Sequence, residues 1–177
     1  MSTESYFDGG EIWCYSERTA VPPQTELSKL DVHFNEGVPA DFEYARGRSC
    51  PVILHILLND VYSKQLCDLF TKGSHHRNIS VIMITQNLFH QVRYYRDISL
   101  NAKYLVLLKN VSDKNRFMFL ARQVYPENSA SLNKAYLDAT QRPHGNLFLD
   151  LTQDTDDSLR VRTDIFPTEQ TIVYSPI

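Results

Sequence analysis

Eight residues in the first third of the chain, Pro51-Val52-Ile53-Leu54-His55-Ile56-Leu57-Leu58, are almost all apolar. Such a run is typical of a strand that is covered on both faces in a parallel sheet. A helix through Leu66 that closes at Gly73 is predicted next. A second buried strand is predicted at Asn78–Thr85 and a third at Lys103–Lys109.

Shorter elements are predicted on both sides of these runs. Before and between them, short aromatic and β-branched segments predict strands at 11–15 and 32–34. After them, apolar residues at helical spacing predict a helix that Ser112 caps and Pro126 stops. The remaining predictions are a helix at 129–140 and strands at 145–151 and 159–165, joined by an acidic turn at 153–157.

This order of elements predicts a fold class. Strands that alternate with helices favour an α/β fold with a mostly parallel sheet flanked by helices. The length favours a single domain over residues 1–177. In such sheets ligands bind beyond the carboxyl ends of the strands, so the residues that follow each apolar run are the candidates for a site.

Basic residues gather in the middle of the chain, although the net charge is −3. Counts of Lys plus Arg against Asp plus Glu are 5 and 11 for residues 1–71, 9 and 2 for 72–123, and 4 and 8 for 124–177. The middle segment is therefore suited to holding phosphate groups of a nucleic acid. A solvated surface is the other interpretation of the same charges.

Other features of the composition exclude some classes of protein. No run reaches the roughly 18 apolar residues of a membrane helix, and the first residues are polar and acidic rather than signal-like. We therefore expect an intracellular protein, in nucleus or cytoplasm, that is neither secreted nor bound to a membrane. Cys14, Cys50 and Cys67 are widely spaced and odd in number, which predicts buried free thiols rather than a disulfide framework or a metal site.

The residues around the second apolar run resemble a known family. Leu-Phe-Thr-Lys-Gly-Ser-His-His-Arg-Asn at 69–78 leads into Ile-Ser-Val-Ile-Met-Ile-Thr-Gln-Asn-Leu-Phe-His-Gln at 79–91. Further matches follow in the same order at 96–102, 120–126, 138–140, 143–145 and 162–167. Together they resemble the DNA-packaging ATPases of the FtsK/HerA superfamily found in Polinton-type elements and related large DNA viruses. The resemblance spans roughly residues 11 to 168 and implies a P-loop NTPase fold of the RecA/FtsK type.

The phosphate-binding loop of that family is missing from this sequence. Its pattern is Gly-x4-Gly-Lys-Ser/Thr, and none of the 6 glycines stands in it. In the family this loop comes before the strand that here contains Trp13. We therefore expect the sequence to begin just downstream of the loop, and the P-loop core to be incomplete.

The magnesium-binding acids of the family are also replaced. The resemblance aligns their usual pair of Asp with His55 and Ile56. Histidine neither replaces a carboxylate on magnesium nor activates water in the same way. Asp60 is a weak substitute candidate, and its other interpretation is a carboxylate that stabilises a helix N-terminus.

Two further residues take roles from the resemblance. Gln86, at the end of the second apolar run, matches the polar sensor that positions the attacking water, although a polar residue also simply ends a strand there. Arg77 matches the finger that reaches into a neighbour's nucleotide site, or is an ordinary surface arginine. The adjacent His75 and His76 predict no metal site, because neighbours in a turn seldom both point at one ion.

A nucleic-acid contact is predicted after the sensor strand. Arg93, Tyr94, Tyr95 and Arg96 alternate base-stacking and phosphate-neutralising side chains. In the family this segment lies near the central pore of a ring. A solvated loop anchored by its tyrosines is the alternative.

These observations leave three hypotheses about function. The first is a degenerate packaging ATPase that does not hydrolyse ATP, in which ATP and magnesium belong to the ancestral family and no cofactor is expected for this chain. The second is a nucleic-acid-binding or ring-interaction module that uses residues 72–123, with DNA or a homo- or hetero-oligomeric ring as partner. The third is a fragment of an active packaging ATPase. Removal of the first strand of such a sheet also predicts exposed apolar edges.

Overall fold

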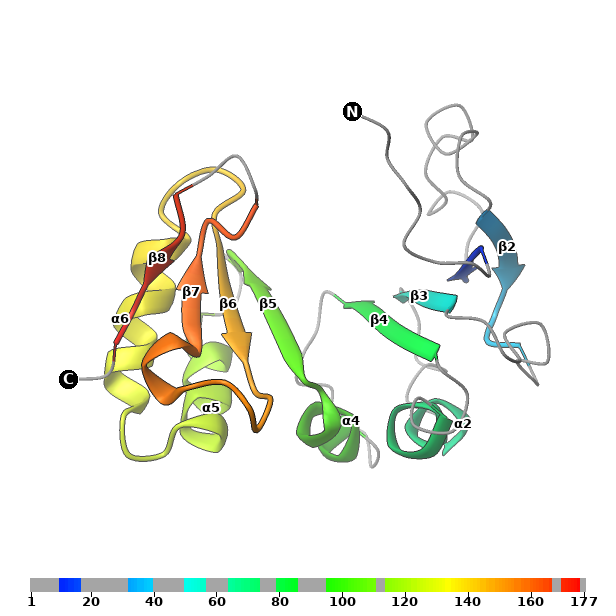
Figure 1. The fold of residues 1–177 in the computed structure, drawn as a ribbon, viewed down its shortest axis with the longest axis horizontal. Helices are drawn as coiled ribbons and strands as arrows, with labels where there is room; N and C mark the ends of the chain where they lie inside the picture. Colours follow the sequence, from blue (N-terminus) through cyan, green and yellow to red (C-terminus); the bar gives the residue numbers. More distant parts are fainter. Residues whose placement is uncertain are drawn as a thin grey trace. The chain divides into compact units, whose positions relative to one another are not determined.

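A computed structural model describes residues 10–16, 32–39, 50–56, 64–73, 79–85, 95–110, 114–166 and 170–175. The chain divides into two compact units, Met1–Asn101 and Ala102–Ile177. Each unit has its own sheet and its own helices (Figure 1). This division does not show whether the two units form one domain, so the single domain over residues 1–177 stays a prediction.

The first unit contains a four-stranded sheet in the order β2-β1-β3-β4. Its strands are β1 (Glu11–Tyr15), β2 (Val32–Glu36), β3 (Cys50–Ile56) and β4 (Ile79–Thr85). All three neighbouring pairs are parallel. The α/β class with a largely parallel sheet is therefore confirmed for this unit.

One face of this sheet is covered by helices. They are α2 (Lys64–Asp68), the π-helical turn η4 (Leu69–Gly73) that continues it, and α4 (Tyr95–Asn101). Val52 and Leu54 of β3 belong to one buried apolar cluster with Leu66 of α2 and Ile98 of α4. The helix through Leu66 ends at Gly73 as predicted.

The opposite face of the same sheet is exposed along β4 and half-buried along β1 and β3. Parallel partners in register share a face, so Trp13, Ile53 and Ile82 lie on one side together with His55 and Ile84. Ile82 is 50% exposed and Ile84 is 42% exposed. The prediction of burial on both faces is therefore wrong for β4. The described helices supply cover for one face only, and an apolar run does not reveal how many faces are covered.

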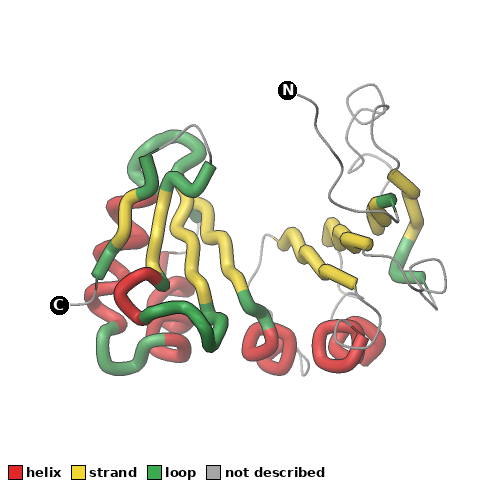
Figure 2. The backbone as a smooth tube through the Cα atoms, in the orientation of Figure 1, coloured by secondary structure: helices red, strands yellow, loops and turns green. Residues whose placement is uncertain are grey.

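The second unit contains an antiparallel sheet in the order β5-β6-β7-β8. Its strands are β5 (Tyr104–Leu108), β6 (Asn146–Asp150), β7 (Val161–Thr163) and β8 (Ile172–Val173). Two helices belong to the unit, α5 (Lys114–Val124) and α6 (Ser129–Ala139). Figure 2 shows them in red against one side of the yellow strands.

The core of the second unit lies between these helices and one face of the sheet. Leu107, Leu147 and Leu149 are buried on the sheet side. On the helix side, the ring of Phe117 stacks on the ring of Tyr136 with centroids 4.1 Å apart. Stacked aromatic rings at this separation add to the free energy gained by burial.

β5 differs from its prediction as a third buried strand. Its partner is β6, in antiparallel register, and it stands at the end of its sheet. Leu107 is buried, whereas Tyr104, Val106 and Leu108 are between 56% and 63% exposed. The prediction of burial on both faces is wrong for the same reason as in the first unit.

Smaller differences concern the predicted boundaries. The helix predicted at 129–140 is confirmed as α6, and the one stopped by Pro126 is confirmed as α5, although Ser112 lies outside the described residues. The strand predicted at 159–165 shortens to β7, because η5 (Asp157–Leu159), a 3-10 turn, takes its first residue. Helix α4 and strand β8 were not predicted. The three cysteines are free and buried, as predicted.

Candidate functional site

Most of the predicted site residues cannot be placed. Those outside the described residues are Asp60, His75, His76, Arg77, Gln86, Arg93 and Tyr94. Tyr95 and Arg96 form the first turn of α4 rather than a loop, and their side chains are not among those described. The roles assigned to these residues therefore stay predictions.

The end of β3 is where the family's magnesium-binding acids are expected. His55 stands there, opposite Ile84 of β4. Its ring lies 6.2 Å from the ring of Trp13, centroid to centroid, with the planes tilted by 42°. The seven residues of β3, Cys50–Ile56, include no carboxylate.

Polar atoms near this end of the sheet lack partners. The Nδ1 atom of His55, the Nε1 atom of Trp13 and the Oγ atom of Ser16 are buried without a hydrogen bond to any described residue. A buried polar atom without a partner costs about 1 to 3 kcal/mol. The described residues therefore leave three buried polar atoms at this end of the sheet without a partner.

The second unit contains a paired charge network centred on Asp150 at the end of β6. One carboxylate oxygen accepts hydrogen bonds from the backbone N–H of Thr152 at 3.1 Å and from its hydroxyl at 2.7 Å. The other accepts from the hydroxyl of Thr155 at 2.9 Å and from the guanidinium of Arg162 at 2.8 Å. Burial by itself raises the pKa of Asp150, but these hydrogen bonds and the charge of Arg162 outweigh it and lower the pKa.

Two arginines complete this network. The guanidinium of Arg162 also lies over the ring of Phe148, 5.0 Å from its centroid. Arg160 donates to the carboxylate of Asp157 at 2.6 Å and to the carbonyl oxygens of Asp150 and Thr152. These bonds hold the loop of residues 151–160 against the end of β6.

The acidic turn has the structural role that the sequence predicted. Asp156 caps η5 by accepting a hydrogen bond from the backbone N–H of Ser158 at 2.8 Å. Asp157 is held by Arg160. These carboxylates are turn and cap groups rather than a paired acid and base.

A broad cleft of about 520 Å³ adjoins the network. Residues 124–128 line one side, and residues 151–153 with Asp157 and Arg160 line the other. Among these described lining residues there is no histidine, cysteine or lysine, and the arginine is already bonded to Asp157. The hydroxyl of Thr152, which also lines the cleft, is bonded to the Asp150 carboxylate at 2.7 Å as part of the network.

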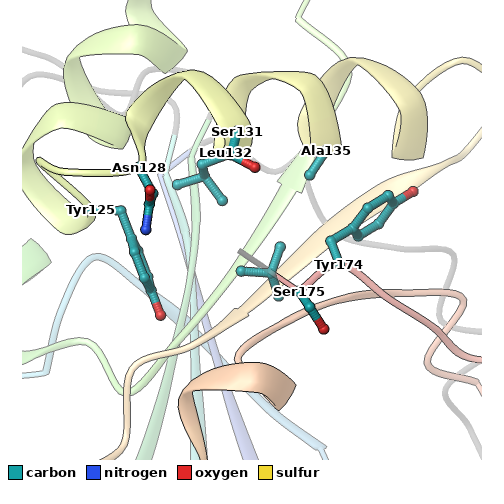
Figure 3. Close-up of a pocket in the computed structure, with 8 residues that line it drawn as sticks. Tyr125, Asn128, Ser131, Leu132, Ala135, Tyr174 and Ser175 are labelled. Atoms are coloured by element: carbon teal, nitrogen blue, oxygen red, sulfur yellow. The ribbon is translucent and has the colours of Figure 1, made fainter. Parts of the chain in front are cut away.

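A second cavity lies under α6, between Tyr125 and Tyr174 (Figure 3). Its volume is about 20 Å³, which is room for about one water molecule. Tyr174 donates a hydrogen bond to the carboxylate of Asp138 at 2.7 Å, and burial is the main reason why its pKa is raised. The cavity is too small for a substrate.

The described residues include no group of three or more His, Cys, Asp and Glu residues that is placed to hold a metal ion. None of the described helices is long and apolar enough to cross a membrane. Comparison of the chain with protein-family models, with curated proteins and with solved structures finds no match.

The sequence did not predict the pairing of Asp150 with Arg162. A signal was available, because an Asp followed by Thr at the second position along is a common side-chain turn. The partner Arg162, however, comes from another strand, and its approach depends on the register of β6 and β7, where it lies opposite Phe148. Register across strands is not visible in a local pattern.

Proposed function

We propose that this chain is a degenerate relative of the viral and transposon DNA-packaging ATPases, with the remnant of a P-loop NTPase core, and that it does not hydrolyse ATP by itself. The observation that carries the proposal is His55 at the end of β3 beside Trp13, in a strand without a carboxylate. The ordered sequence matches from residue 11 to 168 support the ancestry. The parallel pairing of β3 with β4 is compatible with it.

The chemistry explains why this replacement matters. Magnesium bound with ATP offsets the charge that develops during phosphoryl transfer, and its protein ligands are oxygen atoms. His55 offers a nitrogen in a partly buried aromatic setting, which suits neither that ligand role nor the activation of water. The 177 residues also contain no phosphate-binding loop of the Gly-x4-Gly-Lys-Ser/Thr pattern, so this chain alone does not supply the Lys and backbone N–H groups that hold the phosphates.

Calorimetric titration with magnesium-ATP, together with phosphate release over hours, tests the proposal. We expect neither binding heat nor turnover for the natural sequence. His55→Asp is the matched variant, because it restores one acid without supplying a loop, and we expect it to be equally inactive. Turnover by the natural sequence would overturn the proposal, and turnover by the variant alone would show that the chain holds phosphates elsewhere.

The proposal includes a ring, because Arg77 acts as a finger only across a subunit boundary. Sedimentation velocity over a range of protein concentrations measures whether the chain assembles. We expect a concentration-dependent oligomer that Arg77→Ala leaves intact, since a finger contributes to a neighbour's site more than to assembly. A monomer at every concentration contradicts a ring formed by this chain alone.

DNA binding is a second candidate, favoured by the 9 basic and 2 acidic residues of segment 72–123. Fluorescence anisotropy with labelled duplex DNA should show an affinity that falls linearly, in logarithms, as salt increases. Arg93→Ala and Arg96→Ala should each weaken binding and reduce the salt slope by about 1. Lys134→Ala, an exposed charge outside the segment, is the control. No binding at low salt rejects this candidate.

A further inference from the structure

Strand β5 presents an apolar edge on the second unit. Tyr104 and Val106 are each 56% exposed and Leu108 is 63% exposed. All three lie on the sheet face away from α5 and α6, because their neighbour Leu107 on the same strand is buried in the core. β6 pairs with one side of β5, and no described strand pairs with the other.

The backbone groups on this outer side follow from the register. The N–H of Leu151 donates to the carbonyl oxygen of Lys103 at 2.7 Å. Hydrogen-bonded pairs alternate along an antiparallel ladder, so residues 103, 105 and 107 exchange bonds with β6. The N–H and C=O groups of residues 104, 106 and 108 therefore point outward.

One of these outward groups is already used. The hydroxyl of Tyr136 donates to the carbonyl oxygen of Leu108 at 3.1 Å. No described residue bonds to the N–H groups of Tyr104, Val106 and Leu108 or to the carbonyl oxygens of Tyr104 and Val106. An extended chain laid along β5 can bond to this set, and its alternate side chains would extend the exposed apolar face.

Two lysines flank the edge and select among occupants. Lys103 and Lys109 are exposed, and neither has an ion pair among the described residues. A second copy of β5 in antiparallel register around Val106 would set Lys103 opposite the partner's Lys109, twice over. Like charges directly opposite are destabilising, and lysine at a strand edge is a common barrier to self-pairing. Acidic residues at the same two positions would instead be attracted.

We propose that the β5 edge binds an extended segment of a partner protein that has apolar side chains at alternate positions and an acidic residue at each end. The occupant adds one strand to the antiparallel sheet and covers Tyr104, Val106 and Leu108. Its acidic ends lie against Lys103 and Lys109. This inference goes beyond the proposed function, although Lys103 and Lys109 also belong to the basic segment 72–123 of the DNA-binding candidate.

A pair of synthetic peptides tests the charge rule. The first has the sequence Glu-Val-Thr-Val-Thr-Val-Glu and carries a fluorescent label, and the control replaces both Glu by Lys. We expect the acidic peptide to bind roughly tenfold more tightly at low salt. The difference should shrink as salt screens the exposed charges. Equal affinity of the two peptides, or no binding of either, overturns the proposal.

Changes at Val106 test the backbone contact. Val106→Pro removes the central outward N–H and leaves the bonds to β6, a position where a sheet tolerates proline. We expect it to abolish binding of the acidic peptide, whereas Val106→Thr, which keeps the N–H and the branched shape, should retain it. Val106→Asp should also weaken binding through repulsion, and it keeps the test valid if the proline variant unfolds. Binding that ignores all three changes contradicts strand addition at β5.

Two other occupants give different results. If the edge pairs with a second copy, the chain forms dimers that Val106→Pro and Val106→Asp both dissolve, and the acidic peptide competes with dimer formation. If nucleic acid occupies it, duplex or single-stranded DNA displaces the acidic peptide and the Lys-ended peptide behaves like the acidic one. Either result overturns the proposed partner.

Discussion

In each unit the described helices cover one face of the sheet, and the polar groups on the other face differ in their partners. In the first unit, the ring nitrogens of Trp13 and His55 are buried without partners among the described residues. In the second unit, the carboxylate of Asp150 has four hydrogen bonds, one of them from Arg162. The Oδ1 atom of Asn146 and the Nε atom of Arg162 are also buried without a partner among the described residues, so the second unit differs by the Asp150 network rather than by an absence of unpaired atoms.

This difference has an energetic consequence. Unpaired buried polar atoms lower stability, and a paired and hydrogen-bonded carboxylate does not. We therefore expect the second unit to unfold at higher denaturant concentration than the first. Substitutions in the two units can test that ranking and the contacts behind it.

Truncation of one core leucine in each unit is the strongest test. Leu54 of β3 and Leu147 of β6 are both fully buried, so Leu54→Ala and Leu147→Ala should each cost about 3 to 4 kcal/mol. Native-state hydrogen exchange measures where the loss falls. If the units unfold separately, Leu147→Ala should speed exchange in residues 104–163 and leave β3 unchanged, and Leu54→Ala should do the reverse. Uniform loss from either change means that the chain unfolds as one unit.

Removal of the charge on Asp150 should have the next largest effect. Asp150→Asn keeps the shape but leaves Arg162 without its ion-pair partner, so a cost of about 3 kcal/mol is expected for the second unit. Denaturant titration at neutral pH gives the number. Asp154→Asn changes an exposed carboxylate of the same turn and should stay within about 0.5 kcal/mol of the natural sequence.

The pH dependence of unfolding, compared between the natural sequence and Asp150→Asn, shows whether the ionised carboxylate stabilises the folded state. Because the folded pKa of Asp150 is lowered, its stabilisation is fully present above the unfolded value of about 3.9 and is lost as pH falls from there through the folded pKa. The natural sequence should therefore lose more stability than Asp150→Asn on acidification below about pH 4. Parallel curves for the two proteins would show that the carboxylate is not selectively stabilised by folding.

One glycine in each unit resists substitution, for a different reason. Gly145 has no room for a side chain, and Gly37 has a positive φ. A Cβ on Gly145 would lie 2.2 Å from the carbonyl oxygen of Ala139, so Gly145→Ala should force the backbone apart at a cost of about 2 to 3 kcal/mol. Gly37 has free space but a φ of +76°, and Gly37→Ala should cost about 1 kcal/mol. Thermal unfolding of both variants ranks them. A larger loss at Gly37 would mean that the first unit is the more constrained of the two.

Sequence patterns predicted where the helices and strands lie far better than which faces of the strands are buried. The strand at 11–15 and the helix at 129–140 were placed to within about a residue, because local apolar spacing and breakers such as Pro126 decide them. Burial on both faces was wrong for β4 and β5, because cover comes from elements distant in sequence. The expectation of apolar edges left by a missing strand stays a prediction.

The candidate site was less predictable still. A resemblance assigns roles to Gln86 and Arg77, but neither lies among the described residues, and both roles stay predictions. The network around Asp150 depends on pairing between β6 and β7 at Phe148 and Arg162. No local pattern encodes that register. What the sequence did indicate was the acidic turn at 153–157, because turn residues are a local signal. It did not predict the cap by Asp156 or the pair of Asp157 with Arg160.

The smallest effect concerns how β5 is held from its covered face. The hydroxyl of Tyr136 donates to the carbonyl oxygen of Leu108 and accepts from the N–H of Asn110, both at 3.1 Å. Tyr136→Phe keeps the ring stacked on Phe117 and removes both bonds, so we expect a loss of about 1 kcal/mol. Hydrogen exchange should accelerate at Asn110 while the amide of Leu107, bonded to β6, stays protected. If the amide of Leu107 also loses protection, the hydroxyl of Tyr136 stabilises the whole of β5 rather than its end alone. Helix α6 would then position the outward backbone groups of β5 as well.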